Sequence, residues 1–566
     1  MANKTRISGS DALLKSLMAE GTDVIFGYPG GQVIPLYDRL YDYKDKITHI
    51  LTRHEQGAAH AAQGYARATG KVGVCISTSG PGATNLLTGI ADAMLDSTPL
   101  VCITGQVPSS ILGTDAFQEA DIVSMSMPIT KWNYQVTTAS EIASAVAKAF
   151  YIARSGRPGP VLIDITKNAQ VEEVDFAYRP CTGLRSYNPK PKMNCPTSEV
   201  VELINASKRP LILAGQGVKL AGAEQALIGF AEIGNIPVAT TLMGISAIPN
   251  SHPLFVGNLG MHGNVAPNEM TQEADLLIAV GMRFSDRITG AIKDYAPNAK
   301  IIHIDIDPAE LGKNLRCDIP VHADALDALE AFKVGLKYVE RKEWFAFAKE
   351  KAEIEKENVK GFCGEARDGF ITMSQVIQKL AEVEEANAVI VTDVGQNQMF
   401  SARYSKFNQT RSFITSGGLG TMGFGLPAAM GAKVGVPERE VVAVLGDGGF
   451  QMTMQELGTI MQNKIGVKIL VLNNSYLGMV RQWQQLFFNS RYSFTELENP
   501  DFAKIAAAYN IPSKRIIKPE ELESALREMK EAKGSYFLEV AVFPQENVFP
   551  MVPAGASLSN LLMSED

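Results

Sequence analysis

The sequence predicts an α/β protein made of three doubly wound domains, each built on a parallel sheet. Short runs of aliphatic and β-branched residues alternate with Ala-rich helical segments along almost the whole chain. The chain has 566 residues, 46% of them hydrophobic, so it is long enough for roughly three or four domains with their own cores. Its 49 glycines suit the many tight turns that connect strands to helices in such domains.

The first domain is expected over residues 1–185. Its apolar runs are typical of buried parallel strands, at 72–77, 99–104 and 160–165. Residues 140–154 form an Ala-rich helical segment between two of these strands. The stretch 178–198 is rich in Pro, Gly and polar residues and has no periodicity, which predicts a linker.

The second domain is expected over residues 193–355 and the third over 370–545, followed by a tail at 546–566. The second domain has predicted strands at 209–218, 236–242, 275–281 and 299–307, and the third at 388–395, 440–449, 467–474 and 535–542. The charged segment 340–360 is expected to be a solvated connecting helix. We expect the apolar, Pro-rich tail to act as a lid.

The composition excludes several classes of function. The net charge is -8 and no basic run stands out, so no nucleic acid partner is expected. The six cysteines (Cys75, Cys102, Cys181, Cys195, Cys317 and Cys363) form no C-x-x-C pair, which indicates core thiols and no disulfide framework or zinc site. No targeting segment and no run of 18 apolar residues is found, so we expect a cytoplasmic protein that does not span a membrane.

The strongest chemical signal is the stretch 441–479. A hydrophobic strand ends at Gly446-Asp447-Gly448, and a second one ends at Asn473-Asn474 after 24 intervening residues. Both polar ends are expected at the carboxyl edge of one parallel sheet, where such folds bind ligands. Asp447, Asn474 and the backbone carbonyl of Tyr476, together with diphosphate oxygens, would complete the coordination of Mg²⁺. The glycines allow the backbone to approach the phosphates, and the following helix N-terminus favours anions.

This spacing resembles that of thiamine diphosphate enzymes, and it suggests a role for Glu55. Glu55 opens an Ala/Gly-rich helix, where an acid is also favoured by the helix dipole alone. A buried carboxylate bonded to a ring nitrogen of the cofactor's aminopyrimidine would promote its imino form, which removes the proton from the reactive carbon. Glu55 would then act on the cofactor and not on the substrate.

Nearly the whole chain resembles the catalytic subunits of the acetohydroxyacid synthase (acetolactate synthase) family, of the biosynthetic, FAD-containing type. The matching stretches include "RHEQGAAHAAQGYAR", "STSGPGATN", "GTDAFQEADI", "GMRFSDRITG", "TSGGLGTMGFGLPAAMGA", "GDGGFQMTMQEL" and "LNNSYLGMVRQWQ". The resemblance implies a pyruvate oxidase-like fold. It also implies decarboxylation of pyruvate and ligation to pyruvate or 2-ketobutyrate, the first shared step of branched-chain amino-acid biosynthesis.

The resemblance also implies roles for individual residues. Glu55 activates the aminopyrimidine and Met452 supports the bent cofactor. Arg283 pairs with the carboxylate of the second keto acid, and Trp483 shapes the space for its side chain. The remaining residues line the pocket (Gln118, Phe117 and Lys167) or hold the pyrimidine and diphosphate (Gln396, Gly420 and Met422).

The middle domain is expected, from the same resemblance, to bind FAD that takes no redox part in the reaction. The residues implied are Arg157, Gly215, Gly217, His262, Arg283, Asp305 and Asp324. Each active site would be built between two subunits of a homodimer or a dimer of dimers, and a small regulatory subunit is expected as a further partner.

The sequence departs from the family pattern at two places. Ser285 replaces an acid in "RFSDR", and we expect acceptor binding to survive because Arg283 and Asp286 are retained. Asn397 and Phe400 replace other residues in "GQNQMF" and are expected to alter the pyrimidine-side wall.

Related activities remain as alternatives. A catabolic, FAD-independent acetolactate synthase, a pyruvate oxidase and a glyoxylate carboligase share the cofactor, and a non-enzymatic protein of the same fold is a further class. Glu55 argues against the glyoxylate carboligase, the "GMRFSDR" segment argues against the catabolic form, and the retained Glu55, Asp447 and Asn474 argue against a non-enzymatic protein.

Overall fold

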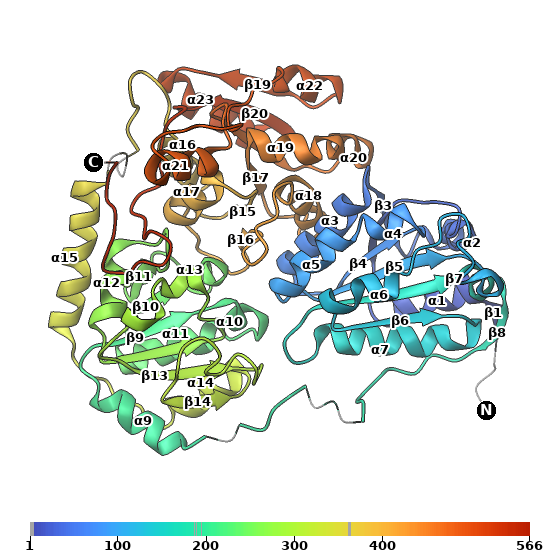
Figure 1. Ribbon diagram of the computed structural model, residues 1–566, viewed down its shortest axis with the longest axis horizontal. Helices are drawn as coiled ribbons and strands as arrows, with labels where there is room; N and C mark the ends of the chain where they lie inside the picture. Colours follow the sequence, from blue (N-terminus) through green and yellow to red (C-terminus); the bar gives the residue numbers. More distant parts are fainter. Residues whose placement is uncertain are drawn as a thin grey trace.

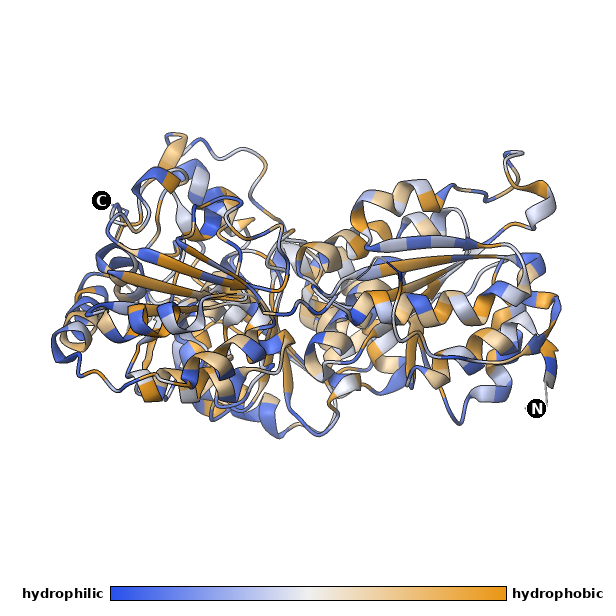
Figure 2. Cartoon of the chain, turned by 90° about the horizontal axis from the view of Figure 1, so that it is seen from below, coloured by the Kyte–Doolittle hydropathy of each residue, from blue (hydrophilic) through white to orange (hydrophobic). Residues whose placement is uncertain are grey.

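The computed structural model describes residues 5–185, 187, 189–193, 195–359, 361 and 364–565. These residues form three α/β domains, each with a six-stranded parallel sheet (Figure 1). The predicted fold class is therefore confirmed. Helices cover the faces of the sheets, and the strands are strongly apolar (Figure 2), as expected for parallel strands that are buried on both sides.

The N-terminal domain has the strand order β3-β2-β4-β5-β7-β6. Its strands are β2 (Val24–Gly27), β3 (Thr48–Leu51), β4 (Gly73–Ser77), β5 (Leu100–Gln106), β6 (Trp132–Val136) and β7 (Pro160–Thr166), and β1 (Thr5–Ser8) pairs with β8 (Glu173–Phe176) in a separate antiparallel ribbon. Its helices are α1 (Gly9–Ala19), α2 (Ile34–Leu40), α3 (Glu55–Thr69), α4 (Pro81–Thr84), α5 (Leu87–Leu95), α6 (Ile122–Ser126), α7 (Ile142–Arg154) and α8 (Lys167–Val171). The three runs predicted as strands in this domain are confirmed as β4, β5 and β7.

The middle domain has the order β11-β10-β9-β12-β13-β14, in which the chain starts at the centre and fills one side before the other. This is the order of dinucleotide-binding folds, which bind their ligand between the first and fourth strands. Its strands are β9 (Pro210–Ala214), β10 (Val238–Thr240), β11 (Phe255–Asn258), β12 (Leu276–Val280), β13 (Lys300–Asp305) and β14 (Ile319–His322). Its helices are α9 (Thr197–Ala206), α10 (Gln216–Leu220), α11 (Glu224–Gly234), α12 (Val265–Glu273), α13 (Asp286–Thr289) and α14 (Ala325–Lys333).

The C-terminal domain has the order β16-β15-β17-β18-β20-β19, the same path as in the N-terminal domain. Its strands are β15 (Val389–Thr392), β16 (Phe413–Ile414), β17 (Val441–Gly446), β18 (Lys468–Asn473), β19 (Ser513–Ile516) and β20 (Tyr536–Ala541). Its helices are α16 (Met373–Val383), α17 (Gln396–Tyr404), α18 (Gly425–Gly435), α19 (Asp447–Thr453), α20 (Leu457–Asn463), α21 (Gly478–Phe487), α22 (Phe502–Ala508) and α23 (Leu522–Glu531).

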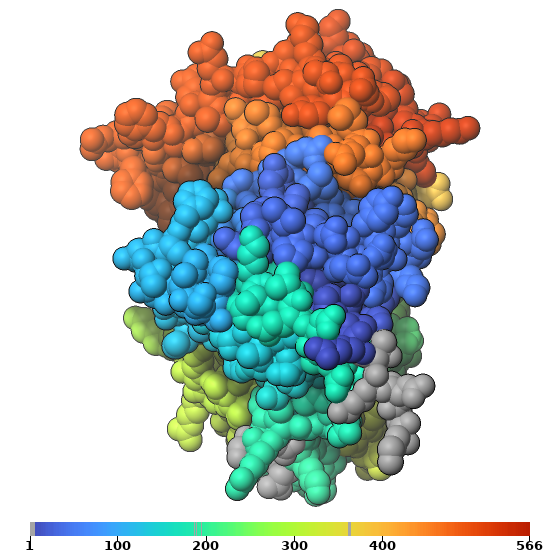
Figure 3. Space-filling view, turned by 90° about the vertical axis from the view of Figure 1, so that its right-hand side faces the viewer, coloured from blue at the N-terminus to red at the C-terminus, as the bar shows by residue number. Residues whose placement is uncertain are grey.

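The N- and C-terminal domains pack together through α3 and α18, which lie side by side at the centre of the molecule (Figure 1). A methyl group on Gly64 would lie 1.9 Å from the carbonyl oxygen of Ala428, and one on Gly431 would lie 1.8 Å from that of Ala61. The two backbones therefore touch, which only glycine allows. Figure 3 shows the molecule from the side of the N-terminal domain, which lies in front, with the C-terminal domain above it and the middle domain below it.

The connecting segments differ partly from expectation. Within the predicted linker, Ser186, Asn188 and Asn194 lie outside the described residues, and the rest is irregular until α9 begins. The charged segment forms α15 (Lys342–Asn358), as predicted, but this helix is not simply solvated, because Trp344 and Glu355 on it are buried.

The cysteines match the prediction only in part. Cys75 and Cys102 are buried, with their sulfur atoms 3.4 Å apart, whereas Cys181, Cys195 and Cys317 are only partly buried. All five are free thiols, and Cys363 lies outside the described residues. In the described part of the chain, no helix is long and apolar enough to cross a membrane.

Candidate cofactor and active site

The strongest predicted site lies at the carboxyl edge of the C-terminal sheet. Strands β17 and β18 are neighbours and end at Gly446 and Asn473. Asp447, Asn474 and Tyr476 therefore come together, and they line a cavity of about 60 Å³. The strand order reverses beside it, between β15 and β17, where open α/β sheets bind ligands.

Asp447 carries a buried charge without a cationic partner. Its Oδ1 accepts a hydrogen bond from the backbone N–H of Gly448 (3.0 Å) and its Oδ2 accepts one from Asn499 Nδ2 (2.7 Å). No Lys, Arg or His among the described residues forms an ion pair with it. Burial raises the pKa of Asp447 to about 6, against the effect of these hydrogen bonds. A cation would compensate for this desolvation.

The oxygen set at this cavity suits Mg²⁺. Asp447 offers one carboxylate, Asn474 an amide oxygen and Tyr476 a backbone carbonyl, and Mg²⁺ commonly takes one or two protein carboxylates together with phosphate oxygens. No cluster of three or more His, Cys, Asp or Glu side chains that could hold a metal ion is found in the described ranges. With one carboxylate and two neutral oxygens, this ligand set leaves coordination positions for phosphate oxygens.

Asn499 is a member of this site that the sequence did not reveal. Its Nδ2 donates to Asp447 Oδ2 (2.7 Å) and to Asn473 Oδ1 (2.9 Å), and its Oδ1 accepts from Gln451 Nε2 (2.9 Å). It thus fixes the ends of β17 and β18 relative to each other. A single Asn in a loop far along the chain carries no sequence signal for this role.

Gln396 links the cavity to the tail. Its Oε1 accepts from Asn474 Nδ2 (3.3 Å), and its Nε2 donates to the backbone oxygen of Glu546 (2.6 Å). A methyl group on Gly478 would lie 2.1 Å from Gln396 Oε1, so the start of α21 closes over this amide. Gln396, Gly446, Gly448 and Met422 line the small cavity as well.

The tail packs closely on the rest of the chain. Val548 exchanges two hydrogen bonds with the side chain of Gln482 on α21 (2.9 and 3.1 Å), and the backbone N–H of Val552 donates to Met261 in the middle domain (2.8 Å). Figure 1 shows the tail descending from the C-terminal domain onto the middle domain. It therefore ties the two domains together beside the site.

Glu55 lies at the start of α3 and is 9% exposed. Its Oε2 accepts a hydrogen bond from Asn85 Nδ2 (3.0 Å), and its Oε1 faces Gly82, where an added methyl group would come within 3.2 Å. Neither the small cavity nor the larger one described below is lined by Glu55. A single copy of the chain therefore does not bring Glu55 to the Asp447 cavity.

Five other predicted residues also line neither cavity: Gln118, Phe117, Met452, Lys167 and Gly215. Gln118 has a left-handed backbone (φ 61°), and its neighbour Phe117 is 84% exposed. Met452 is 55% exposed, and Lys167 is the first residue of α8, directly after β7. Exposed apolar side chains such as those of Phe117 and Met452 are typical of surfaces that contact another protein.

A cavity of about 1210 Å³ lies where the three domains meet. It exceeds the roughly 300–1,000 Å³ of most small-molecule sites. It includes the point of strand reversal in the middle domain, between the ends of β9 and β12. Its lining contains these residues predicted for the flavin or the active site: Arg157, Gly217, His262, Arg283, Asp305, Asp324, Gly420, Met422 and Trp483.

The turn after β9 packs directly against the backbone of Gly281, which follows β12. A methyl group on Gly215 would lie 2.2 Å from the carbonyl oxygen of Gly281, and one on Gly217 would lie 2.6 Å from the Cα of Gly281. Asp305, at the end of β13, is buried, and burial raises its pKa to about 6. His262 has a buried Nδ1 without a hydrogen-bond partner, and burial lowers its pKa to about 3.

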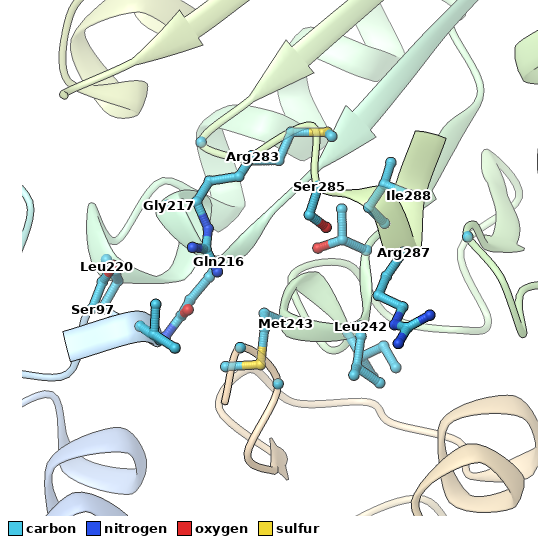
Figure 4. A pocket seen from close by; sticks show the side chains of 18 of the residues that line it. Ser97, Gln216, Gly217, Leu220, Leu242, Met243, Arg283, Ser285, Arg287 and Ile288 are labelled. Atoms are coloured by element: carbon cyan, nitrogen blue, oxygen red, sulfur yellow. The ribbon is translucent and has the colours of Figure 1, made fainter. Parts of the chain in front are cut away.

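Arg283 and Arg287 both line this cavity. Figure 4 shows Arg283 extending toward Gln216 and Gly217, whereas Arg287 points away from them. Arg283 has no hydrogen-bond or ion-pair partner among the described residues, and Asp286 pairs with Arg287 instead, at 3.8 Å. The guanidinium of Arg283 is thus free for an anion.

The departures from the family pattern have distinct settings. Ser285 lies in the large cavity and precedes α13. Asn397 lines the small cavity and donates to the backbone oxygens of Asp393 and Val444 (2.9 and 3.0 Å). Phe400 is 3% exposed within the hydrophobic core and lines neither cavity.

A buried ion pair fixes one wall of the large cavity. Glu355 on α15 pairs with Arg403 on α17, and their side chains are 2% and 1% exposed. Glu355 also accepts from Asn264 Nδ2 (2.9 Å), and Arg403 donates to the carbonyl oxygen of Gly263 (2.8 Å). The turn at residues 260–263 is therefore held by α15, which the sequence analysis had described only as a charged connecting helix.

Comparisons with known proteins agree with this architecture. Three family models match: "Thiamine pyrophosphate enzyme, N-terminal TPP binding domain" over residues 7–125, the "central domain" of the same enzymes over 197–332, and their "C-terminal TPP binding domain" over 393–540. A probable acetolactate synthase large subunit of Methanocaldococcus jannaschii is 47% identical, with 98% of this chain and 95% of that protein covered. The chain belongs to the acetolactate synthase large-subunit family of thiamine pyrophosphate enzymes.

Other members of this family are similarly close. The acetolactate synthase large subunit of Corynebacterium glutamicum is 45% identical over 98% of this chain and 90% of its own length. The acetolactate synthase isozyme 2 large subunit of Escherichia coli is 44% identical over 98% of this chain and 99% of its own length. The family suggested by the sequence stretches is therefore confirmed.

Proposed function

We propose that this chain decarboxylates pyruvate and ligates the remaining two-carbon unit to a second 2-keto acid. Pyruvate as acceptor gives 2-acetolactate, and 2-ketobutyrate gives 2-aceto-2-hydroxybutyrate. The supporting observation is the buried, unpaired carboxylate of Asp447 beside Asn474 at a point of strand reversal, in a chain of this family. The names of the relatives support the reaction class.

Thiamine diphosphate, when bound, supplies a nucleophilic carbon and an acceptor for the electron pair released by decarboxylation. Asp447, Asn474 and the Tyr476 carbonyl would hold Mg²⁺ against its diphosphate, with Gly446 and Gly448 leaving room for the phosphates. Gln396, Gly420 and Met422 would orient the cofactor, and Met452 would support it. The carboxylate of Glu55 would hold a proton at a ring nitrogen of the aminopyrimidine.

Substrate recognition would fall to the large cavity and to the first-domain loops. Arg283 would bind the carboxylate of the acceptor, and Trp483 would limit its side chain. Arg287 lies in the same cavity, so the two arginines need separate tests. Gln118, Phe117 and Lys167 would complete the pocket from the first domain, and the tail would exclude water while the acceptor arrives.

The middle domain would hold FAD in a structural role. The dinucleotide-type strand order and the place of Gly217 in the lining of the large cavity support this proposal. Gly215 and Gly217 would approach the diphosphate of FAD, and Arg157, Arg283, His262, Asp305 and Asp324 would contact the remaining groups.

The site would be completed by a second copy of the chain. Glu55 lines neither cavity in its own chain, so it would serve the Asp447 cavity of the partner subunit. A homodimer is then the smallest active unit. The designation of the relatives as large subunits supports a smaller regulatory partner.

Complementation tests the reaction and the shared site together. Glu55→Gln and Asp447→Ala enzymes are each expected to form no acetolactate from pyruvate with Mg²⁺ and thiamine diphosphate. If they are mixed and allowed to exchange subunits, mixed dimers carry one intact site, and activity returns. Inactive wild-type protein would refute the function, and no recovery on mixing would refute only the shared site.

A further inference from the structure

We propose that Arg67, Asp92 and Asp96 of the N-terminal domain are positioning residues that set the shape of residues 415–423, here called the cofactor loop. The inference rests on the proposed function, because this loop carries Gly420 and Met422. It adds a second duty to the N-terminal domain. Besides offering Glu55 to a partner, this domain would hold the cofactor loop of its own chain.

The loop is anchored by carboxylates from another domain. Asp96 accepts hydrogen bonds from the backbone N–H groups of Gly417 (2.9 Å) and Gly418 (2.7 Å). Asp92 Oδ1 accepts from the hydroxyl groups of Ser416 and Thr421, the latter at 2.8 Å. Four donors of one loop thus converge on two carboxylates at the C-terminal end of α5.

The position of these carboxylates is itself fixed by a cation. Arg67, near the end of α3, contacts Asp92 Oδ2 (3.4 Å) and Asp96 Oδ2 (3.0 Å), and it donates to the backbone oxygen of Thr415. The side chains of both aspartates are fully buried and that of Arg67 is 7% exposed. Breaking such a pair leaves an uncompensated buried charge, which is far more costly than losing an exposed pair.

The cofactor loop lies next to both cavities. Gly417, Gly418 and Gly420 line the large cavity, and Met422 lines both cavities. The guanidinium of Arg283 approaches Gly418 so closely that an added methyl group there would lie 3.3 Å from it. The loop therefore fills the space between Asp96 and Arg283. A shift of the loop would also move Gly420 and Met422, which line the cavities.

The same end of α5 also reaches the middle domain. Ser97, next to Asp96, accepts a hydrogen bond from Arg157 Nε (2.8 Å), and Arg157 pairs with Glu310 (2.9 Å) and Asp307 (3.2 Å). The end of α5 is thus a junction of all three domains. A substitution at the end of α5 is therefore expected to change the affinity for the cofactor, and not only the stability of one domain.

The test is to titrate wild-type protein and variants with thiamine diphosphate at saturating Mg²⁺ and to measure the binding by calorimetry. Asp96→Asn is expected to weaken binding roughly ten- to a hundredfold, as for the loss of one or two charge-assisted hydrogen bonds. Hydrogen exchange at Gly417 and Gly418 is expected to speed up in the same variant. The matched control is Asp11→Asn, because Asp11 accepts from Arg39 and Tyr43 within the N-terminal domain and does not contact the loop.

Milder variants cover the case in which Asp96→Asn does not fold. Asp92→Asn, Ser416→Ala and the double variant form a cycle, and the two single losses are expected to be non-additive because the groups share a hydrogen bond. Cofactor affinity equal to wild type in these variants, or equal losses in the Asp11→Asn control, would overturn the proposal. Wild-type protein that binds no thiamine diphosphate would instead refute the proposed function.

Discussion

Asn499 offers a sharp test of the proposed Mg²⁺ site, because it contacts Asp447 and is not one of the proposed metal ligands. In Asn499→Ala, Asp447 Oδ2 loses its donor at 2.7 Å and Asn473 Oδ1 loses its donor at 2.9 Å. The first is a charge-assisted bond worth about 1.5–3 kcal/mol, and the second a neutral bond worth about 1 kcal/mol. The carboxylate would then turn more freely, and the ends of β17 and β18 would lose their link.

The expected result is weaker Mg²⁺ binding at the proposed site with an intact fold. Partners that orient a metal ligand typically contribute 10–100-fold in metal affinity. We therefore expect Asn499→Ala to need roughly 10–100 times more Mg²⁺ for half-maximal binding of thiamine diphosphate, measured by calorimetry. The acetolactate rate at saturating Mg²⁺ is expected to fall much less.

The matched control is Asn205→Ala in the middle domain. The side chain of Asn205 makes two hydrogen bonds, one to the carbonyl oxygen of Gly335 (3.0 Å) and one from the N–H of Lys337 (2.9 Å), against the three of Asn499. It is remote from Asp447 in the fold, so its loss is expected to leave the Mg²⁺ requirement unchanged. The reasoning is refuted if Asn499→Ala and wild type need the same Mg²⁺ concentration.

Three further changes have expected outcomes. Glu355→Ala leaves Arg403 buried without its carboxylate, so we expect about 3–5 kcal/mol of destabilisation and faster loss of FAD, measured by thermal unfolding and by flavin absorbance. Gly64→Ala places a methyl group 1.9 Å from the carbonyl oxygen of Ala428, so we expect destabilisation of about 1–3 kcal/mol and a lower melting temperature. Burial raises the pKa of Glu546 to about 7, so the folded state holds this proton more tightly than the unfolded state. The protonated side chain of Glu546 therefore contributes stability that is present in full below the unfolded pKa and is lost as pH rises through 7. We expect the difference in melting temperature between wild type and Glu546→Gln to shrink between pH 5 and pH 8.

Two of these changes have a matched control variant. Glu353→Ala, on the same helix as Glu355, removes only an exposed pair at 3.8 Å and is expected to be nearly neutral. Gly31→Ala places its methyl group where nothing lies within 4 Å. Equal effects in test and control variants, or a Glu546→Gln difference that grows with pH, would contradict the reasoning.

The sequence predicted the strands and the Asp447 cavity well, because both depend on local patterns. A buried parallel strand is a continuous apolar run, and the polar residues at its end lie at the ligand-binding edge whatever the rest of the chain does. The runs that became β4, β5 and β7, and the ends of β17 and β18, follow this logic.

The residues that the sequence missed act on partners that are far away in the chain or in another domain. Asn499 reaches Asp447 from a distant loop, Asp92 and Asp96 reach the cofactor loop from another domain, and Glu355 is buried on a helix that is otherwise charged and exposed. Their partners are far away in sequence, so no periodicity or spacing marks them. The same holds for α3 and α18, whose contact depends on two glycines that resemble any other helix glycine.

The most direct test of the proposed enzyme is acetolactate formation from pyruvate with Mg²⁺ and thiamine diphosphate, with and without FAD, on protein first shown to be free of flavin. Product that appears only with FAD is predicted by the carboligase reaction and by the flavin site in the middle domain. Product that forms equally without FAD would contradict the flavin site and indicate the FAD-independent type. Acetaldehyde or acetate in place of acetolactate would contradict the carboligation itself.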